Sequence, residues 1–307
     1  MPKIEATLRN FTVFSNDVRD VSFPYLALIK FAITTGHASK DLLKFGGYSL
    51  LEALGRVIEI RRALVVQKNR LRPTRYFMDL EKTDKGILSF SVGNSISGLL
   101  ADKIAKVPWL LSLEVYKNEH KVTFGPSLKR PDYIGMTASQ QWYVVESKGR
   151  TSSPSTTDLR KWKEQSSAVT HIDGVPVTCG LASVALIRDG FDAVALWDDP
   201  ELPEKSSMIE ISIERFFQSY YSPVEALISG GHKTIDGQYG SLTYVEEADL
   251  YVGLHNVARG SWSEQKFKNL QSFAEKQLSL DTDQNQAVNG EMLFADGVIL
   301  KLGPSWS

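Results

Sequence analysis

The chain of 307 residues contains a single cysteine, Cys179. One cysteine cannot close an internal disulfide, which excludes the small, disulfide-stapled secreted domains. The first residues, MPKIEATLRN, lack the apolar core of a signal peptide, and no run approaches the roughly 18 apolar residues of a membrane span. We therefore expect a cytoplasmic protein without a membrane partner. Because Cys179 lies in the apolar run VTCGLASVALI, we expect it to be a buried, inert thiol.

Several motifs that carry chemistry are also missing. Neither GxxxxGK[ST] nor GxGxxG occurs, so nothing in the sequence indicates an NTPase or a dinucleotide-dependent enzyme. The five histidines lack the close spacing of a zinc site. The formal net charge is −1, so any attraction to nucleic acid must come from local patches rather than from the whole surface.

One such patch lies between Arg56 and Arg75, where the only acid is Glu59. We expect nucleic-acid contacts from its last part, at Arg70, Arg72 and Arg75, with a solvated helix face as the alternative. The basic residues of the patch are Arg56, Arg61, Arg62, Lys68, Arg70, Arg72 and Arg75.

The hydrophobic pattern divides the chain into three regions. Residues 1–92 form an N-terminal α+β recognition region, in which the pattern predicts a strand, two amphipathic helices and a hairpin over 75–92 with its turn at Lys82–Gly86. Residues 205–307 form a C-terminal α+β elaboration. Its first helix carries aromatic residues at the spacing of a core face, namely Phe216, Phe217, Tyr220 and Tyr221.

The middle region, 93–204, predicts a layered α/β core. A helix over 93–107, with Asn94 or Ser95 as N-cap, is followed by strands over 108–117, 121–134 (irregular) and 141–148. A second helix, capped by Thr156 or Thr157 and running to 169, precedes strands over 177–187 and 192–197. We expect Asp198 and Asp199, after the last strand, to lie in a solvated loop.

Glu146 and Lys148 are two residues apart at the charged end of an apolar strand, so their side chains share a face. Asp132 is on the preceding strand. If the two strands form a hairpin with an odd loop, such as 137–139 or 136–140, Asp132 pairs with Val144 and joins that face; an even loop places it on the other.

Two neighbouring carboxylates repel, and a divalent cation removes that conflict. Hard oxygen ligands favour Mg²⁺ or Mn²⁺ over zinc. Such a cation activates water and stabilises charge on a phosphate under attack, and Lys148 can position that water or neutralise the developing charge. These are the parts needed for phosphodiester hydrolysis.

Arg130-Pro131-Asp132 followed by Glu146-Ser147-Lys148 resembles the PD…(D/E)xK signature of the restriction-endonuclease-like nucleases. The order of elements over roughly residues 93–200 is also similar to the core of that family. The resemblance implies an α/β fold with a restriction-endonuclease-like mixed sheet flanked by helices. It implies that Asp132 and Glu146 bind the metal and that Lys148 assists the nucleophile.

The resemblance also implies further site residues on the flanking helices. Asp102 is the favoured third metal ligand, with Glu114 as a weaker candidate, and the helix after the motif offers Gln165 to catalysis and Lys161 to nucleic acid. The expected activity is metal-dependent cleavage of DNA, in restriction or anti-phage defence, with a protein partner in a multi-subunit system. The alternative is a catalytically silent scaffold that binds nucleic acid or a protein.

Overall fold

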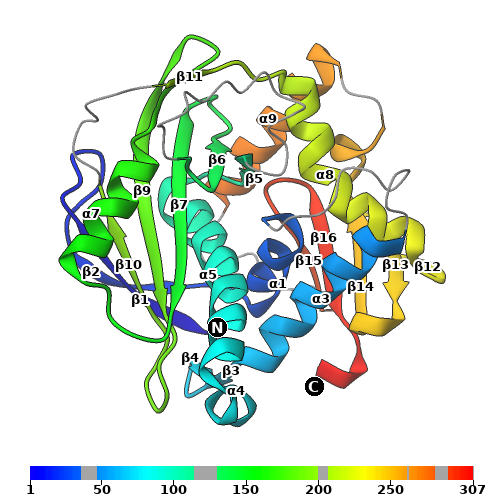
Figure 1. The fold of residues 1–307 in the computed structure, drawn as a ribbon. Helices are drawn as coiled ribbons and strands as arrows, with labels where there is room; N and C mark the ends of the chain where they lie inside the picture. Colours follow the sequence, from blue (N-terminus) through cyan, green and yellow to red (C-terminus); the bar gives the residue numbers. More distant parts are fainter. Residues whose placement is uncertain (36–46, 114–129, 200–206, 261–262, 281–289, 307) are drawn as a thin grey trace.

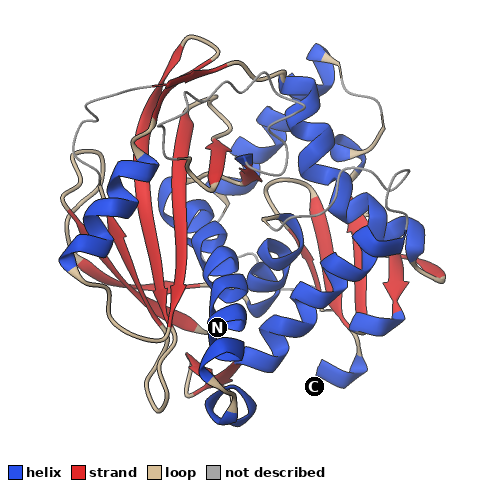
Figure 2. Ribbon diagram, in the orientation of Figure 1, coloured by secondary structure: helices blue, strands red, loops and turns tan. Residues whose placement is uncertain are grey.

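The computed structural model describes residues 1–35, 47–113, 130–199, 207–260, 263–280 and 290–306. These form a mixed α/β fold in which helices lie between two sheets (Figures 1 and 2). The larger sheet has 11 strands within the described residues, and both parallel and antiparallel pairs occur along its order β3-β4-β1-β10-β9-β7-β6-β5. Its strands are β1 (Lys3–Arg9), β2 (Val18–Ser22), β3 (Leu64–Gln67), β4 (Arg70–Pro73), β5 (Trp109–Ser112), β6 (Tyr133–Met136), β7 (Trp142–Arg150), β8 (Val169–Ile172), β9 (Val175–Leu186), β10 (Val194–Asp198) and β11 (Ser207–Ile209).

The smaller sheet is antiparallel and belongs to the C-terminal region, with the order β12-β13-β14-β16-β15. Three short 3₁₀ turns, η1 (Glu246–Ala248), η2 (Asn256–Ala258) and η3 (Pro304–Trp306), connect or follow its strands. The strands are β12 (Lys233–Asp236), β13 (Ser241–Val245), β14 (Leu250–Leu254), β15 (Glu291–Leu293) and β16 (Val298–Leu302).

Three of the described helices lie in the space between the sheets, and Figure 1 shows them between β7–β10 and β13–β16. α1 (Tyr25–Thr34) is buried almost throughout, as expected of a helix with neighbours on every side. α5 (Lys82–Ala105) packs on β7 and β9, and α3 (Gly47–Ala63) packs on α1 and α5. α8 (Ile213–Gly230) joins α3 to the smaller sheet, and α4 (Arg75–Asp79) and α9 (Glu264–Ser279) lie at the periphery.

The structure of residues 75–107 differs from the one predicted. The hairpin expected over 75–92 is wrong, because α4 and the first turns of α5 occupy it, and the helix begins at Lys82 rather than at Asn94 or Ser95. Leu88 and Val92 are both buried and continue the four-residue spacing of the later helix back to its first turns. The alternation of apolar and polar residues in ILSFSV, which favours a strand, is overridden by packing against the sheet.

The second core helix, α7 (Thr156–Ser166), begins one residue earlier than expected. Ser155 is its N-cap: its hydroxyl accepts from the Asp158 N–H, and the Asp158 carboxylate accepts from the Ser155 N–H, which is a capping box. The helix ends at Ser166 rather than at Val169: residues 167 and 168 form a turn, and Val169 begins β8. The strand predicted at 121–125 lies outside the described residues.

One hydrophobic core runs through all three predicted regions. Buried residues from Ile4 to Leu300 form a single cluster, and β1 of the first region pairs with β10 of the second. The boundary expected at 92/93 falls inside α5. The aromatic residues of α8 are fully buried, and Cys179 is buried, as their patterns predict.

Candidate active site

β7 presents different residues to the helices on its two sides. On one face, the hydroxyls of Ser97 in α5 and Ser147 are 2.8 Å apart. By strand alternation, Glu146 and Lys148 lie on the opposite face. On that side α7 covers the neighbouring strands, with Trp162 packed on Ala182 and other residues of β9 and β10. The motif therefore lies beside α7 and away from the interior helices.

The hairpin of β6 and β7 brings Asp132 to the same face. Met136 pairs with Trp142, which leaves an odd loop of the kind the prediction required. The predicted pairing of Asp132 with Val144 is wrong by two residues, since Val144 pairs with Ile134. Any loop with an odd number of residues places Asp132 on the same face. Asp132 lies one residue beyond the last pair, Tyr133 with Val145, and is therefore opposite Glu146.

The three side chains of the motif converge. The Lys148 ammonium is 3.1 Å from Asp132 Oδ2 and also contacts Glu146 Oε1. The Ser147 N–H donates to the same Asp132 oxygen at 2.9 Å. Behind this peptide, the Ser97 hydroxyl donates to Ser183, which also accepts from Trp197 at 2.9 Å. Buried hydrogen bonds thus hold the middle of the motif strand against α5.

Burial and charge act strongly on this cluster. The Glu146 side chain has no exposed surface, whereas about a third of Asp132 is exposed. Burial, with a contribution from the Asp132 charge, raises the pKa of Glu146 to about 8, although Lys148 acts in the opposite direction. Burial by itself would lower the pKa of Lys148, but the two carboxylates outweigh it and the pKa is raised. Lys148 therefore stays cationic between two acids of very different exposure.

The donor set of this cluster fits a hard divalent cation. Glu146 Oε2 is buried without a hydrogen-bond partner among the described residues, so it has a lone pair available to a cation. Within the same residues there is no group of three or more His, Cys, Asp and Glu side chains placed to hold a metal. Asp132 and Glu146 would therefore supply two ligands, and water or substrate oxygens would complete the coordination of Mg²⁺ or Mn²⁺.

The expected third ligand, Asp102, is not brought to this cluster. It lies near the end of α5, the helix on the other side of the sheet, and its carboxylate is 3.8 Å from the Lys103 ammonium. It lines a cavity of about 500 Å³ together with residues of β2 and β15, among them Arg19 and Met292. The weaker candidate, Glu114, lies outside the described residues.

Of the two candidates on α7, only Gln165 approaches the motif. Its amide is 3.4 Å from the carbonyl oxygen of Arg130, two residues before Asp132, whereas Lys161 is exposed. The cation of α7 that reaches the sheet is Lys163, whose ammonium is 3.0 Å from Asp198. Ala182 of β9 pairs with Glu146 of β7 on one side and with Asp198 of β10 on the other, so Asp198 lies in register with Glu146 two strands away. Asp198 is 5% exposed, so the expectation of a solvated loop is wrong for it.

The basic residues of the first region are dispersed by the fold. Arg70 forms two hydrogen bonds with Asp20 of β2, and Arg72 forms one with Asp192 at 2.6 Å. These pairs connect β4 to β2 and to the segment just before β10. Arg75 projects from α4, 92% exposed and 3.9 Å from Asp79, and is the one of the three whose guanidinium points freely into solvent.

The comparisons with family models, with curated proteins and with solved structures found no match. Among the described helices, none combines the length and the apolar character that a membrane crossing requires.

Proposed function

We propose that this chain is a metal-dependent nuclease with a restriction-endonuclease-like core, which hydrolyses phosphodiester bonds of DNA. One observation carries the proposal: Asp132, Glu146 and Lys148 converge on one face of an antiparallel hairpin although 14 positions separate the first two. A strand that ends in a structural ion pair needs only two charges, and it has no reason to bury one carboxylate beside a second. A role in restriction or anti-phage defence, with a protein partner, extends the same proposal.

Each residue of the cluster has a distinct task in this proposal. Asp132 and Glu146 would hold Mg²⁺ or Mn²⁺, which supplies charge stabilisation and lowers the pKa of a bound water. Glu146 is largely protonated at neutral pH in the free protein, so binding of the cation would release a proton. The Ser147 N–H fixes one oxygen of Asp132, and Lys148 offers N–H donors to the attacked phosphate.

One observation favours the second candidate, a silent scaffold. The Lys148 ammonium is paired with Asp132, and the raised pKa of Glu146 lets that carboxyl keep its proton, so the cluster has no net charge even without a cation. A scaffold of this kind would bind nucleic acid or a protein without cleavage. The two candidates differ in the cleavage expected of the parent and in the effect of removing each carboxylate in turn.

The test compares cleavage of plasmid, linear duplex, single-stranded DNA and RNA with Mg²⁺, with Mn²⁺ and with EDTA. Asp132→Ala and Glu146→Ala should each abolish cleavage, because each removes a metal ligand, while Lys148→Ala should keep metal binding and lose about 10²–10³-fold in rate. Asp102→Ala is the matched control, since it removes a buried carboxylate on the far side of the sheet. Cleavage by Asp132→Ala at the parent rate would contradict the assignment, and a parent that cleaves none of the four substrates would favour the scaffold.

A further inference from the structure

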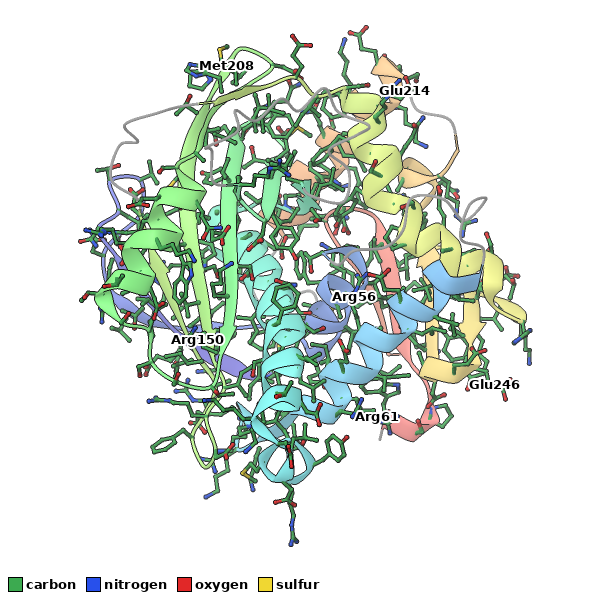
Figure 3. All side chains as sticks on the ribbon, viewed as in Figure 1. Arg56, Arg61, Arg150, Met208, Glu214 and Glu246 are labelled. Carbon is green, nitrogen blue, oxygen red and sulfur yellow. The ribbon has the colours of Figure 1, made fainter. Side chains whose placement is uncertain are left out.

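Arg150 continues the row of motif side chains. It is the last residue of β7, and strand alternation places it on the face of Glu146 and Lys148. Figure 3 labels it at the end of this strand. Gly149, between the two cations, faces α5, because a Cβ there would meet the Ser89 carbonyl oxygen. Successive side chains on one face lie about 6.5 Å apart along a strand, so Arg150 is the next group beyond Lys148.

The Arg150 guanidinium is held in place and still has its donors available. It lies over the ring of Trp162, 5.6 Å from the centroid, and 37% of the side chain is exposed. Its nearest carboxylate, Asp158, is 3.9 Å away, beyond hydrogen-bond distance, and that carboxylate already accepts from Ser155 in the capping box. No hydrogen bond joins the guanidinium to any other group in the described parts of the chain.

This arrangement differs from that of Arg70 and Arg72. The guanidinium groups of Arg70 and Arg72 each donate a hydrogen bond to a carboxylate. The Arg150 guanidinium instead lies over an aromatic ring, and 37% of the side chain remains exposed. A planar fork of this kind matches the oxygens of a phosphate, and an arginine on a rigid strand presents it at little entropic cost.

We propose that Arg150 binds the phosphate next to the one that is cleaved, on the same nucleic-acid strand. The inference rests on the proposed nuclease function and adds the position of the bound strand: it would run along β7 from Asp132 toward Arg150, beside α7. Asp132, Lys148 and Arg150 are the partly exposed members of this row, whereas Glu146 lies beneath them. Trp162 sets the plane of the guanidinium and is a positioning residue.

The experiment pairs protein variants with neutral phosphates. The parent is used to map the cleaved bond in a duplex oligonucleotide, and a methylphosphonate then replaces each of the two flanking phosphates in turn. Arg150→Gln should lower kcat/KM on the unmodified duplex at least about tenfold, mainly through KM, because a charge-assisted contact is lost. The kcat/KM of Arg150→Lys should lie between that of the parent and that of Arg150→Gln. Arg19→Gln removes a guanidinium of matched exposure, 38%, on the far side of the sheet and should stay near the parent.

The decisive result is the behaviour on the modified duplexes. With the methylphosphonate at the contacted phosphate, the parent and Arg150→Gln should have the same kcat/KM, whereas the other modified duplex should preserve their difference. A difference that persists on both, or no difference on the unmodified duplex, would overturn the inference and leave Arg150 as a packing residue of α7. If the parent binds the duplex without cleaving it, the nuclease proposal fails, and fluorescence anisotropy with methylphosphonates at successive positions still decides the role of Arg150. A parent that neither binds nor cleaves overturns both.

Discussion

At the scale of single residues, Glu146 is a fully buried acid whose charge is only partly compensated. A carboxylate with no exposed surface is normally paired and fully hydrogen-bonded, yet one of its oxygens has no partner among the described residues. Lys148 offsets only part of the cost, since the pKa of Glu146 still rises to about 8. The protein thus retains a locally unfavourable group, which is expected where a ligand completes the site.

This cost should make stability depend on pH in a defined window. The pKa of Glu146 is about 8 in the folded protein and 4.5 in the unfolded chain, where water solvates the carboxylate fully. Below pH 4.5 both states hold the proton, and the difference in pKa contributes nothing to the free energy of unfolding. As the pH rises from 4.5 to 8 only the unfolded state releases it, so folding stability falls, by on the order of 5 kcal/mol in total.

Glu146→Gln should therefore become more stable than the parent as the pH rises through that window. Urea unfolding in EDTA at about pH 5 and about pH 9 measures the difference, which should grow by a few kcal/mol. Excess Mn²⁺ should then stabilise the parent and leave the variant nearly unchanged, because the variant lacks a charged ligand. Glu264→Gln, on the exposed face of α9, should show no such growth. If the parent and the variant differ in free energy of unfolding by the same amount at both pH values, the fold does not disfavour the charged form of Glu146.

At the scale of elements, the position of the motif depends on how closely α5 approaches β7. A Cβ added to Gly93 would lie 2.5 Å from the Gly149 nitrogen, so the two backbones are in direct contact at this point. Gly86, in the same helix, has nothing within 4 Å of the corresponding position. Substitution by alanine is therefore expected to have opposite effects at the two glycines.

Gly93→Ala should push α5 away from the motif strand and cost about 1–3 kcal/mol through overpacking, and it should lower cleavage because Lys148 and Glu146 shift with the strand. Gly86→Ala should raise stability by about 0.5–1 kcal/mol, since alanine is the better helix former where space allows. Melting curves and cleavage rates of both variants test this. Equal effects at the two positions would mean that the close approach does not set the strand.

The sequence predicts the motif strand, because the strand depends on local order, but it leaves open whether the loop before the strand is odd or even. The period of two fixes the shared face of Glu146 and Lys148, and an odd loop adds Asp132 whatever its length. The start of α5 is missed because ILSFSV has the alternation of a strand, and only its packing reveals the helix. Arg150 is missed for a similar reason: its environment comes from Trp162, whose place depends on how α7 docks.

At the scale of the whole molecule, a buried charge pair joins the interior helices to the smaller sheet. Lys30 of α1 is 1% exposed, and its ammonium is 2.8 Å from Asp296, in the turn between β15 and β16. The Tyr220 hydroxyl of α8 donates to the same carboxylate at 2.5 Å, and Lys30 also donates to the Pro108 carbonyl oxygen, just before β5. The pair therefore connects both sheets and two helices.

Lys30→Met should weaken the molecule as a unit, because it leaves Asp296 buried without its cation, at a cost of about 3–5 kcal/mol. The double variant Lys30→Met/Asp296→Asn should recover most of that loss, since the neutral pair has no uncompensated charge. Lys268→Met is the matched control: it breaks an exposed pair with Glu264 and should cost less than about 1 kcal/mol. Hydrogen exchange at the amides of β7 and β14 gives the readout for each sheet. With one continuous core, the free energy of opening should fall by the same amount in both sheets. A loss of protection confined to β14 would instead show that the C-terminal sheet unfolds independently of the sheet that carries the motif.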